Sequence, residues 1–377
     1  MSADLVLRGG SVVTPSGRVD ADVTIEGGRI LAVGTAGPAE ATIDATGLIV
    51  APGFIDLQVN GGWGADITSE PATMWPLAER LVAHGVTSFL PTVVTSPPAA
   101  VGAARGALRG RPTEFTGAEP LGLHLEGPFI APAKRGAHAA EHIVAPDLAI
   151  AESWTRRDGV AMVTLAPELP GAGAVIEQLR ADGVVVAGGH SEATAAQASA
   201  AIDAGLTHLT HLFNAMAPLA HREPGIVGVG LARSDLTVGL IVDGLHLHPV
   251  TVEAVWRAKG PHGVVLVSDS ASAMGRPHGE HRLGDRRVII DETGIRTRDG
   301  TLAGSAITLD IAVRNLVTFT GCSPDEAITA ASTTPARVIG ATSKGEIAPG
   351  RDADLTLLSA DLGVVATIVG GAIAWSA

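Results

Sequence analysis

Eight short apolar segments recur through the middle of the chain, and helical stretches separate most of them. They span residues 53–58, 86–92, 121–126, 160–166, 184–190, 207–211, 237–243 and 264–269. Strands that alternate with helices form parallel sheets, and eight such units form a barrel. A doubly wound sheet is the alternative, but the loop after Gln58 fits its glycine-rich phosphate turn poorly. We therefore expect an α/β fold built on a (β/α)8 TIM barrel.

Two helix signals and one insertion add detail to the expected barrel. Residues 71–84 follow Ser69, a possible N-cap, and an alanine-rich stretch begins at Ser191 and stops before Gly205. Residues 278–303 have the texture of a hairpin and follow the eighth apolar segment. We expect the first two to form helices and the third to be inserted after the barrel's last strand.

The two ends of the chain differ from the middle. Residues 3–50 and 345–377 consist of short alternating apolar runs with tight turns such as Gly27-Gly28, a hairpin signal. We expect both ends to join in one small β-sandwich. The expected division is 1–50 and 345–377 for the sandwich, and 51–344 for the barrel.

The amino-acid composition limits the kinds of molecule that the protein is expected to bind. Hydrophobic residues make up 46% of the 377 positions, enough for a large core, and the net charge of −13 argues against a nucleic-acid surface. Cys322 is the single cysteine, which excludes an internal disulfide and fits a reducing compartment. The uncharged run 362–377 is shorter than the ~20 residues of a membrane span. We expect a cytoplasmic protein without nucleic-acid or membrane partners.

Polar residues end several of the predicted strands. Glu126, His190 and His211 stand at the ends of the third, fifth and sixth. The strand C-termini of a barrel meet at one face, where the chemistry of such folds lies. One carboxylate and two imidazoles suit zinc and leave a fourth position open. We expect one divalent metal ion per subunit, with zinc favoured.

Two more histidines lie on these strands. His208 comes early in the sixth strand and is expected to face away, which favours His211 as the ligand. His124 lies two residues before Glu126, on the same face of the strand, where a structural role is favoured over support of the site.

Asp269 ends the eighth predicted strand, opposite the expected metal site. A carboxylate at this place can take a proton from water and pass it to a leaving nitrogen. The plainer alternative is an aspartate that caps the following turn. We expect Asp269 to be the catalytic acid and base.

Nine segments together carry a resemblance to a known family. They are PGFIDLQVNGGWG (52–64), HLEGPF (124–129), KRGAHAAEH (134–142), GGHS (188–191), THLFNAM (210–216), HREPG (221–225), VDGLH (242–246), SDS (268–270) and LAGS (302–305). On these motifs the chain resembles the amidohydrolase superfamily, and within it the family of N-acetylglucosamine-6-phosphate deacetylases. HLEGPF with HLFNAM is the specific pair, and the resemblance covers nearly the whole chain.

The resemblance implies an activity and further site residues. The implied reaction is metal-dependent hydrolysis of N-acetyl-D-glucosamine 6-phosphate to D-glucosamine 6-phosphate and acetate, in amino-sugar catabolism. Matching substrate-contacting positions are Ala137, His138, Asn214, Ala215, Arg222, Asp243, Gly244, Leu245, His246, Leu302, Ala303 and Gly304. In the family, His246 and Arg222 help to hold the phosphate, and the arginine comes from a neighbouring subunit. The resemblance thus implies a homodimer.

The end of the first strand departs from the wider superfamily. Many members carry His-x-His there and bind a second metal, whereas this chain has Gln58 and Asn60. The fourth predicted strand, 160–166, holds no lysine that could bridge two metals. We expect a single tightly bound metal, with Gln58 supporting the site by a hydrogen bond.

Two other readings stay open on the sequence. The same chemistry could act on N-acetylgalactosamine 6-phosphate or an N-acyl amino acid, because a fold does not settle the substrate. A non-catalytic scaffold could also keep the barrel. Retention of Glu126, His190, His211 and Asp269 speaks against the scaffold.

Overall fold

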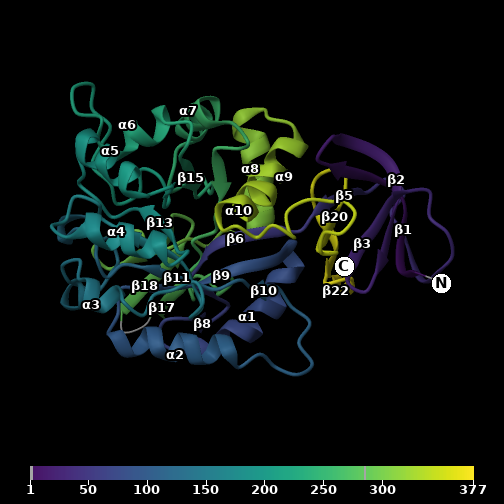
Figure 1. The fold of residues 1–377 in the computed structure, drawn as a ribbon, viewed down its shortest axis with the longest axis horizontal. Coiled ribbons are helices and arrows are strands. Elements are labelled where there is room, and N and C mark those ends of the chain that lie inside the picture. Colours follow the sequence, from purple (N-terminus) through teal and green to yellow (C-terminus); the bar gives the residue numbers. More distant parts are fainter. Residues whose placement is uncertain (1–2, 284–285) are drawn as a thin grey trace.

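The computed structural model describes residues 3–283 and 286–377. It consists of a barrel surrounded by helices and, beside it along the long axis, a smaller sheet that contains both ends of the chain (Figure 1). The TIM barrel expected from the sequence is confirmed, and the expected β-sandwich of both ends is present as a small domain whose strands form one 8-stranded sheet.

The barrel strands run parallel and neighbour one another in sequence order. They are β6 (Phe54–Val59), β9 (Val86–Val94), β11 (Leu123–Glu126), β12 (Val160–Leu165), β13 (Val185–Gly188), β14 (His208–Leu209), β15 (Thr237–Leu240) and β16 (Val264–Leu266), with β10 (Glu119–Pro120) beside β9. A parallel bridge between Val59 and Ser270 connects the first strand to the segment after the last. A doubly wound sheet would reverse its order at a switch point, so that alternative is excluded.

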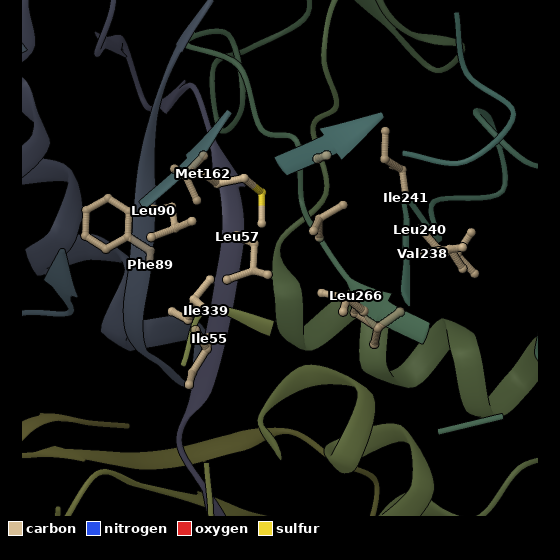
Figure 2. Packing of buried hydrophobic residues seen from close by; sticks show 14 of the residues in the cluster. Ile55, Leu57, Phe89, Leu90, Met162, Val238, Leu240, Ile241, Leu266 and Ile339 are labelled. Carbon is tan, nitrogen blue, oxygen red and sulfur yellow. The ribbon is translucent and has the colours of Figure 1, made fainter. Parts of the chain in front are cut away.

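The core explains why these segments form strands. β6, β9 and β12 are almost wholly buried and rich in apolar residues, as expected for parallel strands covered on both faces. Figure 2 shows side chains from β6, β9, β12, β15 and β16 together in this core, among them Leu57, Leu90, Met162, Leu240 and Leu266.

Helices follow most of the strands and lie outside the barrel (Figure 1). The α-helices are α1 (Met74–Leu81), α2 (Pro98–Arg109), α3 (Leu148–Ala151), α4 (Ala172–Ala181), α5 (Ala195–Ala204), α6 (Gly225–Ala232), α7 (Pro249–Lys259), α8 (Leu309–Thr320), α9 (Pro324–Ala331) and α10 (Thr333–Val338). Short 3-10 turns are η1 (Pro71–Thr73), η2 (Val82–His84), η3 (Pro132–Lys134) and η4 (Ala140–His142). Each helix in the described part of the chain is too short or too polar to cross a bilayer.

Both predicted N-caps are wrong, and the second error is informative. The turn η1 follows Glu70 rather than Ser69, and α5 begins after Thr194, whose side chain forms a capping box with Gln197. The Ser191 hydroxyl instead donates a hydrogen bond to Glu168, at 2.7 Å. Ser191 therefore belongs to the loop that carries His190. Gly205 ends the helix as predicted.

The second sheet combines strands from both ends of the sequence. These are β1 (Ala3–Thr14), β2 (Gly17–Glu26), β3 (Arg29–Gly34), β4 (Ala39–Asp44) and β5 (Ile49–Pro52), with β20 (Leu355–Leu358), β21 (Val364–Val369) and β22 (Ala372–Ser376). β5 pairs antiparallel with β20, so that Val50 lies opposite Leu357. The sheet has an apolar core of its own, which includes Leu7, Ile25 and Ile368. The domain boundaries at residues 50 and 345 stay a prediction.

The insertion after the eighth strand lies where the hairpin was predicted, but it has three strands instead of two. It forms a three-stranded antiparallel sheet of β17 (Gly279–Leu283), β18 (Arg286–Asp291) and β19 (Gly294–Thr297). Val288, Ile290 and Ile295 form a small apolar cluster with Ala271 and Ala303. Through this cluster the insertion packs against the loops that follow Asp269. A separate two-residue ladder, β7 (Gly61–Gly62) with β8 (Ala65–Asp66), follows the first barrel strand.

Candidate active site

A pocket of about 920 Å³ opens where the C-terminal ends of the barrel strands meet. Twelve of the residues expected at the site line it, namely Glu126, His190, His211, Asp269, Ala137, His138, Asn214, Ala215, His246, Leu302, Ala303 and Gly304. Arg222, Asp243, Gly244 and Leu245 are not among its lining residues. The convergence expected from the strand ends is thus present, and the exceptions lie on two loops.

The expected metal ligands meet inside this pocket. Glu126 Oε1 lies 2.9 Å from His211 Nε2 and 3.2 Å from His190 Nε2, and the two Nε2 atoms are 3.1 Å apart. All three side chains are buried. His138 is also near, with its Nε2 3.7 Å from Glu126 Oε2, and it completes an alternative grouping with Glu126 and His190. The shorter distances favour His211 over His138 as the third ligand.

The contacts of His190 are compatible with a cation between these atoms. His190 Nδ1 lies 2.8 Å from the carbonyl oxygen of Lys134, which can only accept, so Nδ1 carries the proton. In the neutral ring, Nε2 then presents a lone pair toward the Glu126 carboxylate. Such a second contact is the usual way to orient a metal-binding imidazole. The chain therefore has a possible metal site of one glutamate and two histidines.

Electrostatics of the metal-free chain agree with this reading. Burial would raise the pKa of Glu126, but its close contacts with the His190 and His211 side chains hold it well below its ordinary value. Burial would likewise lower the pKa of His211, but Glu126 raises it above the ordinary value. The cluster thus favours a carboxylate facing positive charge, the arrangement that a divalent cation satisfies.

Three of these residues have an unusual backbone conformation. His190, His211 and Asp269 have φ values of +48°, +30° and +49°. Left-handed conformations cost roughly 1–3 kcal/mol each for residues with a side chain and persist where surrounding contacts enforce them. They stand just beyond the ends of β13, β14 and β16. The sharp turns direct their side chains into the pocket rather than along the sheet.

Asp269 is held on both its backbone and its side chain. Its N–H donates to the Gln58 carbonyl at 2.9 Å, and its carbonyl accepts from Ser305 N–H at 2.8 Å. Its Oδ1 accepts a hydrogen bond from Asn60 Nδ2 at 2.7 Å. Burial and the nearby charge of Glu126 raise the pKa of Asp269 to about 6. A carboxyl that titrates near neutrality is suited to taking up and returning a proton.

Thr95 holds the His138 ring so that one of its nitrogens faces the pocket. The backbone N–H of Thr95, which can only donate, lies 3.3 Å from His138 Nδ1. The same Nδ1 lies 2.8 Å from the Thr95 hydroxyl, so Thr95 holds one side of the ring and Nε2 faces Glu126. From this position Nε2 can reach an oxygen bound in the pocket. Thr95 could not be expected at the site from the sequence, because its contact with His138 joins two loops that are distant along the chain.

The first-strand amides support the carboxylates. Gln58 Nε2 donates to Glu126 Oε1 at 3.0 Å, which confirms the hydrogen bond expected for Gln58. Asn60 makes the corresponding contact with Asp269. That second contact was not expected from the sequence, although the Gln-x-Asn pattern marked the position.

The other two strand histidines have structural roles. His124 contacts the Leu57 carbonyl at 3.0 Å and the Thr164 hydroxyl at 2.7 Å, and His208 contacts the Thr237 hydroxyl at 2.8 Å. Burial lowers the pKa of His124 to about 4 and that of His208 to about 3. Both are therefore neutral, and neither lines the pocket.

The loop after β15 holds His246 at the pocket edge. Asp243 Oδ2 lies 2.6 Å from His246 Nδ1, and Asp243 Oδ1 accepts the N–H groups of Leu245 and His246 at 2.8 Å each. Asp243 thus acts on His246 instead of facing the pocket. Arg222 is exposed on the loop before α6, outside the pocket of this chain.

Comparison with known proteins places the chain in a family. The model of the amidohydrolase family matches residues 49–374. The human N-acetylglucosamine-6-phosphate deacetylase is 40% identical over 99% of this chain and 94% of its own length. The crystal structure of the Thermotoga maritima N-acetylglucosamine-6-phosphate deacetylase is 34% identical, with a TM-score of 0.90 over 99% of this chain and all of that one.

A third relative contains a ligand. The structure of a Mycobacterium smegmatis N-acetyl-D-glucosamine-6-phosphate deacetylase mutant in complex with N-acetyl-D-glucosamine-6-phosphate is 32% identical, with a TM-score of 0.91 over the full length of both chains. Similarity of this extent includes the barrel, the small β domain and the pocket alike. The chain therefore belongs to the amidohydrolase family.

Proposed function

We propose that this protein is a metal-dependent deacetylase that hydrolyses N-acetyl-D-glucosamine 6-phosphate to D-glucosamine 6-phosphate and acetate, in the cytoplasm. The observation that carries the proposal is the convergence of a possible metal site, Asp269 and His138 in one pocket. Full-length relatives that bear this enzyme's name support the substrate. Retention of the whole constellation disfavours a non-catalytic scaffold.

The proposed metal ligands are Glu126, His190 and His211, and the proposed metal is one zinc ion per subunit. Two imidazoles and one carboxylate suit zinc and leave a position open for water or substrate. When bound, the ion supplies a Lewis acid that acidifies water and polarises a carbonyl. The positions of Gln58 and Asn60, each donating to a carboxylate, support a single tightly held ion.

The side chains perform the proton transfers. Asp269 takes a proton from the attacking water as the oxygen bonds to the acetyl carbon, and His138 donates a hydrogen bond from Nε2 to the acetyl oxygen. Asp269 then returns the proton to the amide nitrogen, the C–N bond breaks, and the sugar amine leaves together with acetate. Because amines are poor leaving groups unless protonated, one carboxyl serves both halves of the reaction.

The phosphate is proposed to lie between His246 and the Arg222 of a second subunit. Within one chain Arg222 is exposed and outside the pocket, so its participation requires a homodimer. A guanidinium suits the bidentate recognition of phosphate, and an acidic chain needs such local compensation.

The function is tested by a coupled assay of acetate release. Purified protein is supplied with N-acetylglucosamine 6-phosphate, its galactosamine epimer and an N-acyl amino acid, with and without added zinc. The proposal expects metal-dependent acetate release, fastest from the glucosamine compound. Faster acetate release from another substrate would change the proposed specificity. If none of the three substrates released acetate, the non-catalytic scaffold would be the better interpretation.

Metal content should be about one tightly held divalent ion per chain. The reason is that, in the described part of the chain, the charged and imidazole ligands gather around Glu126 alone, while Gln58 and Asn60 are neutral amides that donate to carboxylates. Elemental analysis after dialysis provides the measurement. Two ions that resist dialysis would show that Gln58, or a further carboxylate, binds metal.

Arg222→Ala should raise KM for the 6-phosphorylated sugar far more than for the unphosphorylated sugar. Loss of the guanidinium removes phosphate contacts and leaves the acetamido group's environment unchanged. Arg257→Ala, at an exposed side chain of α7, is a matched control that should change neither value. If Arg222→Ala affects both sugars equally, Arg222 does not recognise the phosphate.

A further inference from the structure

Asn60 occupies a fixed place between the first strand and the loop of Asp269. Its N–H donates to the Ser270 carbonyl at 2.9 Å, and its carbonyl accepts from Ile67 N–H at 3.0 Å. The backbone of Asn60 is therefore clamped on both sides. Its side chain lines the pocket and reaches Asp269 Oδ1 through Nδ2 at 2.7 Å.

The chemistry of the contact defines the orientation of the amide. An ionised carboxylate only accepts hydrogen bonds, so the amide must present its NH2 group to Asp269. Asn60 Oδ1 consequently points elsewhere, and it is buried without a hydrogen-bond partner among the residues that the structure describes. Burying an oxygen without a hydrogen bond costs free energy. The contact with Asp269 therefore determines how the Asn60 amide is oriented.

We propose that Asn60 is a positioning residue for Asp269. The amide holds Oδ1, so that Oδ2 is the oxygen that exchanges the proton with water and with the leaving nitrogen. The inference rests on the proposed deacetylase function, in which Asp269 is the acid and base.

The physical reason lies in the freedom of the aspartate side chain. The terminal torsion of an aspartate has a broad energy profile, so a carboxylate without an anchor rotates readily. The backbone contacts of Asp269 fix its Cα, but they do not fix the carboxylate plane. A short hydrogen bond to an ionised acceptor is among the stronger restraints available. Asn60 makes that bond.

A cycle of four proteins tests the proposal: wild type, Asn60→Ala, Asp269→Asn and the double variant. Asn60→Ala should lower kcat roughly tenfold to a hundredfold, with KM and metal content near wild type, because misplacement of a reacting group on the scale of 1 Å costs this much. In the Asp269→Asn background the same change should lower kcat less than about twofold, because positioning no longer matters without proton transfer.

A purely structural role predicts a different pattern. Asn60→Ala would then lower kcat by the same factor in both backgrounds, and that result would overturn the proposal, as would an unchanged kcat in the wild-type background. Gln58→Ala is a matched comparison, since Gln58 donates to Glu126 instead. Its effect should persist in the Asp269→Asn background.

Unfolding measurements make the test independent of activity. Denaturant midpoints of wild type, Asn60→Ala, Asp269→Ala and their double variant should be non-additive, because both single changes remove the same hydrogen bond. Additive midpoints would overturn the inferred contact. If wild type released no acetate while the midpoints stayed non-additive, the proposed function would fail and the contact would stand.

Discussion

Replacing Asp269 with asparagine should lower kcat by roughly a hundredfold or more, the usual scale for loss of an acid–base group. Asparagine keeps the shape and can still accept from Asn60, but it cannot take a proton from water. Metal content and KM should stay near wild-type values, because the proposed ligands are other residues. The measurement pairs kcat with metal analysis on the same purified sample.

A control variant separates the loss of proton transfer from the general effect of removing a buried charge. Asp310 is also buried, pairs with His84 and Arg314, and lies outside the pocket. Asp310→Asn should therefore leave kcat unchanged in the folded protein. If Asp269→Asn lost its metal and regained activity with added metal, Asp269 would be a ligand. If it kept its metal and turned over at the wild-type rate, His138 or His246 would be the next acid–base candidate.

Replacing Glu126 with glutamine should remove the tightly held metal and nearly all turnover. The change deletes the carboxylate that contacts both His190 and His211. A neutral amide is a poor ligand for a divalent cation, so the two imidazoles would be left without a charged partner. The expected result is less than about a tenth of wild-type metal content after dialysis, with a parallel loss of kcat.

Glu119→Gln makes the same chemical change at the opposite end of a barrel strand. Glu119 starts β10, pairs with Arg111, and lies away from the pocket. This control should keep both metal and activity. Full metal content in Glu126→Gln would contradict the ligand assignment and shift attention to the grouping with His138.

The strands and their order followed from the sequence because burial is a local signal. Segments such as β9 and β12 are rich in apolar residues and buried along almost their whole length, and polar residues such as Glu126 mark where other strands end. Parallel strands bring these ends together, so the convergence of Glu126, His190 and His211 could be expected before their distances were known. The preference for His211 over His208 also followed from position in the strand.

Features that depend on contacts between distant loops could not be expected in this way. The left-handed turns at His190 and Asp269 are imposed by neighbours from other strands. The contact between Thr95 and His138 joins two loops that no spacing rule relates. The same holds for Ser191, a good N-cap by type, whose hydroxyl is instead engaged by Glu168. In each case, contacts with residues distant in the sequence determined the local structure, and local propensity did not.

The pairing of β5 with β20 has a consequence for how the chain is made. About 300 residues separate these two neighbouring strands. At about 5–20 residues per second, a ribosome needs roughly 15–60 s to translate that distance. During this time the N-terminal strands are already synthesised, but the edge at β5 has no partner, and such edges promote aggregation. A nascent chain of this architecture should therefore depend on chaperones until its last strands emerge.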